Sequence, residues 1–154
     1  MSYNVAPVYE NLRARAFAFA DPDAPAGSPW GVIMETGYPE GVTTLMALSD
    51  GAVGLMFSNG LTSVGAGRFE GPALAARRLG GLAAKFAPTM PFVADTNLPD
   101  LDQVRLYVLT VTGVKGVAGK QADFGENRLP QSPLFHAAHA VIGEIRKVKP
   151  DPQP

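Results

Sequence analysis

Two nearly continuous apolar runs, joined at Asp50 and Gly51, constrain the fold more than any other feature of this chain. They extend over residues 43–58, and neither alternates between apolar and polar residues as a strand with one wet face would. Both faces of these strands therefore need cover. Because Asp-Gly is a favoured two-residue loop, the pattern predicts a buried hairpin with a type I′ turn, and it places Leu55 in the core.

Length and cysteine content limit the class of protein. A chain of 154 residues is expected to form a single domain, over residues 1–154, that buries roughly 68–70% of its unfolded surface. The absence of cysteine excludes disulfides, thiolate nucleophiles and cysteine-based zinc sites, and it permits a reducing compartment. No signal-peptide pattern and no run of about 18 apolar residues occurs, so we expect a soluble, cytoplasmic protein without membrane contact.

Charge gives no broad field for attracting nucleic acid, because the formal net charge is −1. We therefore expect no nucleic-acid partner. The charges are unevenly distributed: between Arg15 and Arg68 there are five acidic residues and no lysine or arginine, whereas from Arg68 onward 11 basic residues oppose 8 acidic ones. Such an asymmetry suits either complementary contacts between two copies or an ordinary solvated surface.

Periodicity and turn residues predict an α+β protein with one antiparallel sheet of about five strands packed with three helices, in the order α-β-β-β-α-β-β-α. Helices are expected over 7–20, from Pro72 to the residue before Pro88, and over 132–148. Strands are expected at 30–38, in the two arms of the hairpin, at 103–112 and, more weakly, at 114–122. Residues 21–29 read as a proline-rich surface loop, 61–67 as a short edge strand or a loop, and 149–154 as a frayed tail.

This element order is similar to that of profilin-like, roadblock and longin domains, modules that mostly hold partners together. The likeness lies in the order of elements, and the extra strand at residues 30–38 departs from the roadblock pattern. It implies a sheet with helices packed against it and a role in binding partners.

Small residues form a row on the second expected helix, at Ala76, Gly80 and Ala84. The pair Gly80-Gly81 costs helix stability, on the order of 1 kcal/mol for each glycine relative to alanine. Small side chains allow another backbone to approach closely, so we expect a sheet or helix to pack on this row.

A weak phosphate-binding pattern precedes the same helix, formed by Gly60, Gly65, Gly67 and Gly71. The spacing departs from the dinucleotide fingerprint, and Glu70 would place a negative charge beside the helix N-terminus where a pyrophosphate binds. Glycines that serve turns explain the pattern better. The ligand-binding candidates taken from this region and from the loop after 92–94 are Gly65, Gly67, Arg68 and Asp95.

Catalytic and metal-binding patterns are sparse. His136 and His139, the two histidines, lie three residues apart on the last expected helix, with no acidic residue four positions after either, so no metal site is expected. The segment 60–65 places its serine one position late for a nucleophile elbow, and the acids Asp100 and Asp102 suit turn capping. No cofactor is expected.

The favoured function is a non-enzymatic interaction or scaffold module that forms a homodimer, because doubly apolar strands need two covering layers. Two alternatives stay open. One is a small-ligand sensor or binding domain with a pocket near the loop Gly65–Gly71, and the other is a small enzyme that uses loop-borne acids and His136.

Overall fold

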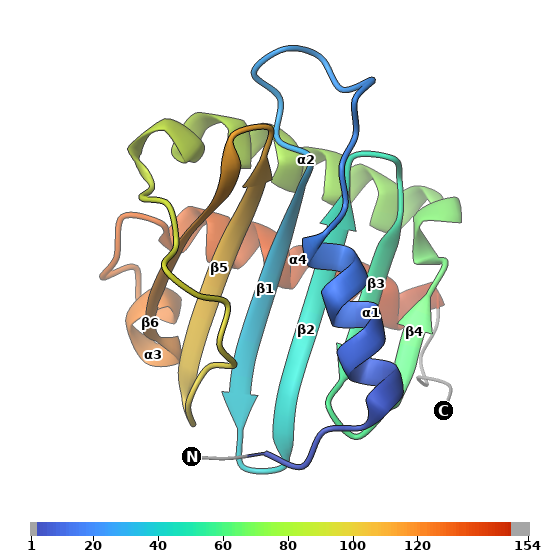
Figure 1. Cartoon of the computed structure of the whole chain (residues 1–154), viewed down its shortest axis with the longest axis vertical. Coiled ribbons are helices and arrows are strands. Elements are labelled where there is room, and N and C mark those ends of the chain that lie inside the picture. The colour runs from blue at the N-terminus through green and yellow to red at the C-terminus, as the bar shows by residue number, and fades with distance from the viewer. Residues whose placement is uncertain (1–2, 149–154) are drawn as a thin grey trace.

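The computed structural model describes residues 3–148 and contains one six-stranded sheet with helices on both faces (Figure 1). The helices are α1 (Pro7–Phe17), α2 (Glu70–Phe86), α3 (Gln121–Gly125) and α4 (Ser132–Val148), with short 3-10 turns η1 (Ala66–Arg68) and η2 (Ala87–Thr89). The strands are β1 (Gly31–Tyr38), β2 (Gly41–Leu48), β3 (Val53–Phe57), β4 (Thr62–Val64), β5 (Gln103–Thr110) and β6 (Gly113–Lys120).

The strand order is β4-β3-β2-β1-β5-β6, and each neighbouring pair is antiparallel. This confirms the expected α+β class with a single antiparallel sheet. The sheet has six strands instead of about five, because the segment at 61–67 does form the short edge strand β4. A fourth helix was not expected: α3 has five residues, too few for an apolar period to appear in the sequence.

Helices α2 and α4 cover one face of the sheet and form the main core with it (Figure 1). Alternate residues of the strands point into this core, including Val32, Met34, Leu45, Leu55 and Leu106. Leu55 is 4% exposed, as expected for the hairpin core. From the helices, the buried contributions are Leu79, Ala83, Leu134, Phe135, Ala138, Val141, Ile142 and Ile145.

The opposite face is covered by α1 and by the segment 90–102, which crosses in front of β5 (Figure 1). Its apolar cluster is small and is built on Ala16, Ile33, Tyr107 and Leu109. The segment also covers part of the edge of β6, because Val93 N–H donates to the Val114 carbonyl and Gly116 N–H donates to the Pro91 carbonyl. Both faces of the central strands are thus covered from within one chain, and the expected homodimer stays a prediction.

A buried polar network attaches α1 to the sheet. Glu35 of β1 is fully buried, and its two carboxylate oxygens accept hydrogen bonds of 2.7 and 2.8 Å from the Arg13 guanidinium. Thr44 of β2 donates to the same carboxylate at 2.8 Å, and Tyr9 lies 2.8 Å from the Thr44 hydroxyl. Arg13 also donates to the Thr96 carbonyl, so one side chain joins α1, β1 and the segment 90–102.

The turn at Asp50 and Gly51 differs from the expected type I′ turn. A type I′ turn needs positive φ at both central residues, whereas of these two only Gly51 has it, at 95°. Leu48 N–H donates to the Ala52 carbonyl, which closes a three-residue loop, and the Asp50 side chain accepts a hydrogen bond from Ala52 N–H. The hairpin is as expected, but its loop is one residue longer because Asp50 serves as a side-chain acceptor.

The row of small residues on α2 does not bring another backbone close, contrary to expectation. A Cβ placed on either Gly80 or Gly81 would meet no atom within 4 Å. The close approach occurs instead at Gly67, where a Cβ would lie 1.9 Å from the Gly51 carbonyl oxygen. Gly67 is therefore the glycine that the packing of the hairpin requires.

The longest connection on the N-terminal side lies between α1 and β1. Residues 18–30, which include the segment expected as a proline-rich loop, form no helix or strand and project beyond the end of the sheet (Figure 1). The expected tail at 149–154 lies outside the described residues. Across residues 3–148, every helix is too short or too polar to cross a membrane.

Candidate functional site

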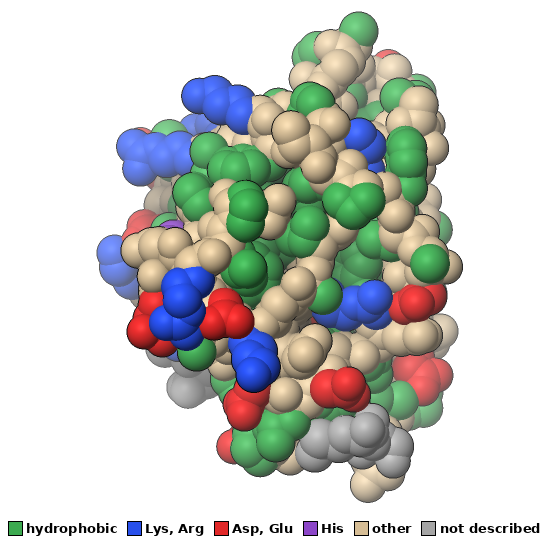
Figure 2. Space-filling view, turned by 90° about the vertical axis from the view of Figure 1, so that its left-hand side faces the viewer, with side chains coloured by type: hydrophobic (Ala, Val, Ile, Leu, Met, Phe, Trp, Pro, Cys, Tyr) green, Lys and Arg blue, Asp and Glu red, His purple; other side chains and the backbone are tan. Residues whose placement is uncertain are grey.

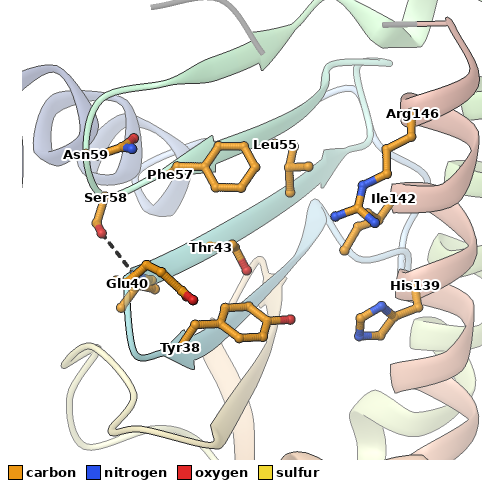
Figure 3. Close-up of a pocket in the computed structure, with 12 residues that line it drawn as sticks. Tyr38, Glu40, Thr43, Leu55, Phe57, Ser58, Asn59, His139, Ile142 and Arg146 are labelled. Carbon is orange, nitrogen blue, oxygen red and sulfur yellow. Dashed lines mark hydrogen bonds between the residues drawn. The ribbon is translucent and has the colours of Figure 1, made fainter. Parts of the chain in front are cut away.

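A pocket of about 500 Å³ opens between α4 and the end of the sheet where β1 turns into β2 (Figure 3). Three segments line it: the β1–β2 turn with the start of β2, the end of β3, and one face of α4. Its volume falls within the range of about 300–1,000 Å³ that is typical of small-molecule sites. The lining residues are Tyr38, Glu40, Gly41, Val42, Thr43, Leu55, Phe57, Ser58, Asn59, His139, Ile142 and Arg146.

Helix geometry brings the three α4 residues to one side of the pocket. His139, Ile142 and Arg146 are spaced by three and four residues, so they lie on one face of the helix. Ile142 packs into the core and is 8% exposed, which fixes the rotation of the helix. The polar side chains before and after it, His139 and Arg146, are therefore held at the pocket wall (Figure 3).

The turn on the other side of the pocket is held by Ser58. The Ser58 hydroxyl accepts a hydrogen bond of 2.9 Å from Val42 N–H, and Ser58 N–H donates to the Val42 carbonyl at 2.9 Å. A Cβ on Gly41 would lie 2.3 Å from the same hydroxyl oxygen, so only glycine allows this contact. The turn that carries Tyr38 and Glu40 is thus held by specific contacts with β3.

Several polar side chains at the pocket have no partner within residues 3–148. The side chains of Tyr38, Glu40, Thr43 and Arg146 form no hydrogen bond or ion pair there, and the buried Nε2 of His139 has no hydrogen-bond partner. Figure 3 shows the Tyr38 hydroxyl and the His139 ring pointing toward one another. Buried polar groups are normally satisfied, so an unpaired imidazole nitrogen beside a cavity requires an explanation.

Electrostatics keep His139 neutral. Burial lowers the pKa of His139 below its ordinary value, and coulombic interactions with His136 and Arg146 lower it further. At neutral pH the imidazole therefore offers a neutral donor or acceptor. The charged groups that line the pocket are then one cation, Arg146, and one anion, Glu40.

The floor of the pocket is apolar, formed mainly by Leu55, Phe57 and Ile142 (Figure 3). An apolar floor with a few polar groups around it is the usual composition of a small-molecule site, because burial supplies affinity and the polar groups supply orientation. The arrangement is suited to holding an organic molecule with both apolar and polar parts.

A second hollow, of about 430 Å³, lies between α2 and the β2–β3 loop. Small residues line much of it, including Ala73, Ala76, Gly80, Gly81 and Ala84. Its charged side chains, Asp50 and Arg77, are exposed, as are Glu40 and Arg146 at the first pocket, but no buried polar atom without a partner belongs to its lining. It therefore offers less specific chemistry than the pocket beside α4.

The candidates taken from the glycine pattern lie in two separate places. Gly65, Gly67 and Arg68 form the turn between β4 and α2, where Gly65 has φ of 82° and the Arg68 guanidinium stacks on the Phe69 ring at 5.0 Å. Asp95 lies in the segment on the other face of the sheet and pairs with Arg105 at 3.0 Å. Of these, only Gly67 borders a hollow, the one beside α2.

The two histidines have different surroundings. His136 is exposed, and its Nε2 lies 2.8 Å from the Asn127 side-chain oxygen, whereas His139 faces the pocket. Among residues 3–148, no three His, Asp or Glu side chains come together as a metal site would require. The loop acid Asp102 adopts φ of 64°, a conformation typical of turns.

Sequence reasoning missed Tyr38, Glu40, Thr43 and Arg146 as members of one site. They come from segments about 100 residues apart, and no spacing along the chain relates them. One signal in the sequence could have indicated part of the site. A histidine and an arginine, one turn before and one turn after Ile142, lie at the border of the apolar face of α4, where a polar side chain is able to reach a pocket beside the core.

Comparison with known proteins gives no relative for this chain. No protein-family model matches it, and neither a curated protein nor a solved structure shows a significant match. The inference of function therefore depends on the geometry of the pocket.

Proposed function

We propose that this protein is a binding domain for a small organic molecule, which it holds in the pocket between α4 and the β1–β2 turn. The alternative role of a ligand-binding domain, expected from the sequence at another place, thus becomes the leading proposal at this pocket. The observation that supports it most is a cavity of about 500 Å³ whose lining includes the hydroxyls of Tyr38 and Thr43, which have no hydrogen-bond partner within residues 3–148. A ligand in the cavity would supply partners for these hydroxyls.

Burial of apolar surface would supply part of the affinity. The side chains of Leu55, Phe57 and Ile142 line the floor, and removing apolar surface from water contributes roughly 25 cal/mol for each Å² buried. The pocket needs no rearrangement of the sheet, because its walls are held by the core of α4 and by the contacts of Ser58. A preformed site loses little free energy to ordering when it binds.

Titration with N-phenyl-1-naphthylamine, an uncharged fluorescent probe of apolar sites, tests the proposal. We expect a saturable rise in emission with the natural chain. Thr43→Phe would fill the pocket, and it should weaken binding at least roughly tenfold, since it removes the space for the probe. Thr62→Phe, a matched change at a half-buried threonine of β4 outside the pocket, should leave binding unchanged.

Two outcomes would contradict the proposal. One is the absence of saturable binding to the natural chain, and the other is an equal loss of affinity in Thr43→Phe and Thr62→Phe. Circular dichroism of each variant ensures that a loss of binding does not reflect a loss of fold.

A second candidate is the interaction module expected from the sequence, in the form of a homodimer. Phe92 is 58% exposed and Val111 is 73% exposed, and the Phe92 ring would lie 3.4 Å from a Cβ on Gly113, two residues after Val111. Figure 2 shows hydrophobic side chains gathered on the side of the molecule that carries β6. Exposed apolar groups that lie close together favour association.

Light scattering coupled to gel filtration tests the homodimer. A dimer should have twice the chain mass of 16.2 kDa, and Phe92→Ser with Val111→Ser should return it to the monomer mass. A mass of 16.2 kDa that does not change with concentration would exclude it.

A further inference from the structure

Two opposite charges stand on the two sides of the pocket beside α4. Arg146 extends from the last turns of α4, and Glu40 extends from the β1–β2 turn, with the apolar floor between them (Figure 3). They form no ion pair with each other, and neither has a partner elsewhere in residues 3–148. Both side chains are exposed, and the exposed Arg77 and Arg78 of α2 likewise form no ion pair within residues 3–148, so it is their position on the two sides of the pocket that distinguishes Arg146 and Glu40.

The two charges select against ligands with a single charge. An organic anion placed on Arg146 would share the cavity with the Glu40 carboxylate, and an organic cation placed on Glu40 would share it with the Arg146 guanidinium. Specificity often arises from such repulsion as much as from attraction. A ligand with a negative group at one end and a positive group at the other meets attraction on both sides.

We propose that the ligand of this pocket is zwitterionic: a short apolar peptide whose terminal carboxylate binds Arg146 and whose terminal ammonium group binds Glu40. This inference rests on the proposed function of the pocket. The planar guanidinium is able to hold a carboxylate with two parallel hydrogen bonds, and a carboxylate accepts readily from an ammonium group. The aliphatic part of the ligand lies on Leu55, Phe57 and Ile142.

The neutral polar groups suit the middle of such a ligand. Thr43 and Tyr38 present hydroxyls to the cavity (Figure 3). A peptide bond carries one donor and one acceptor, which these hydroxyls are able to satisfy. A free amino acid has no peptide bond, and its two charges share one carbon and do not reach both sides of the pocket, so it should bind more weakly.

Four forms of one dipeptide test the inference by displacement of the uncharged probe at pH 7. They are Leu-Leu, its N-acetyl form with only the negative charge, its amide with only the positive charge, and the doubly blocked neutral form. We expect Leu-Leu to bind roughly fivefold to tenfold more tightly than either singly charged form, because each charge adds a charge-assisted contact at a partly exposed site. Free leucine, measured in parallel, separates an amino-acid site from a peptide site.

Two substitutions assign the charges. In Glu40→Gln the affinity ratio of Leu-Leu to its N-acetyl form should fall to about one, and in Arg146→Gln the ratio of Leu-Leu to its amide should do the same. Each ratio is measured within a single variant, so a general weakening of the pocket cancels. Glu10→Gln and Arg15→Gln, on the exposed part of α1 and outside the pocket, are the matched controls and should keep both ratios.

The result that overturns the inference is a singly charged or neutral form, or free leucine, that binds as tightly as Leu-Leu, or a failure of Leu-Leu to displace a probe that does bind. In either case the uncharged probe still occupies the pocket, and the proposed function stands without the zwitterionic ligand. Failure of the probe to bind the natural chain contradicts the proposed function itself.

Discussion

The two faces of the sheet are closed by different kinds of interaction. On one face, α2 and α4 bury an extensive apolar core, whereas on the other the short helix α1 is attached largely through the Arg13, Glu35, Thr44 and Tyr9 network. An apolar core is stabilised by many weak contacts, so the loss of one contact removes only a small part of the total stabilisation. A buried charge pair depends on both of its members, so the two faces should respond differently to substitution.

The difference also explains where the pocket lies. The functional candidate is on the face with the apolar core, at the place where α4 passes over the end of the sheet and the floor is not completely covered. On the other face, two arginines are paired with carboxylates, Arg13 with Glu35 and Arg105 with Asp95. These pairs hold the fold together, whereas Glu40 and Arg146 at the pocket form no ion pair within residues 3–148.

The largest effect is expected from Arg13→Met on the polar face. It would leave the fully buried Glu35 carboxylate without its counter-charge, and breaking a buried pair in this way costs about 3–5 kcal/mol. The Arg13 side chain is 17% exposed, so entry of water should bring the loss toward the lower end of that range. Urea unfolding measures it.

The double variant Arg13→Met with Glu35→Leu is the matched control. Replacing both charges with apolar side chains removes the unpaired charge, so much of the lost free energy of unfolding should return. A double variant less stable than Arg13→Met alone would show that the ion pair is not the main attachment of α1.

An effect of comparable size is expected from Leu79→Ala on the apolar face. Leu79 of α2 is fully buried in the main core and lies outside the pocket, so truncation should cost about 2–5 kcal/mol without changing ligand binding. No second substitution on this face should restore the loss as the double variant does on the other. A loss below 1 kcal/mol would mean that α2 is not packed as described.

The sequence was sufficient to predict the elements whose pattern is local. The doubly apolar hairpin, the strand at 103–110 and the amphipathic helix at 132–148 were all found, because burial imposes a period that is readable along the chain. The five-residue helix α3 was missed, since it is shorter than the period that would reveal it.

Contacts between distant segments were not predictable in the same way. Glu35 was counted among the acidic residues of its region, and nothing near it in the chain indicates that Arg13 and Thr44 meet it. The pocket has the same origin, because Tyr38 and Arg146 meet only when β1 and α4 pack on the same sheet. The glycine row on α2 gave the opposite kind of error. A local pattern predicted a close backbone contact, and the fold does not make that contact.

Gly80→Ala tests whether the glycine row makes such a contact, and it should raise the free energy of unfolding by about 1 kcal/mol. A Cβ at this helical position meets no atom within 4 Å, so alanine would improve helix propensity without a clash. Gly67→Ala is the contrasting variant and should destabilise, because its Cβ would collide with the Gly51 carbonyl. Thermal unfolding of both variants measures the difference, and a destabilised Gly80→Ala would indicate that α2 packs on another surface.

The smallest effect at neutral pH is expected from Tyr107→Phe on the polar face. The buried Tyr107 hydroxyl has no hydrogen-bond partner within residues 3–148, so its removal should change the free energy of unfolding by less than about 1 kcal/mol.

At alkaline pH, the burial of the Tyr107 hydroxyl should affect the free energy of unfolding. Burial, and then the negative charge of Glu35, raise the pKa of Tyr107 to about 12 from the model-compound value of 10.0. The unfolded chain therefore loses this proton before the folded chain does, and stability should fall as pH rises from about 10 to about 12. Tyr9, whose pKa burial also raises, should leave part of this slope in Tyr107→Phe. An identical alkaline slope in the natural chain and in Tyr107→Phe would show that the Tyr107 phenol is not protected from water as its burial indicates.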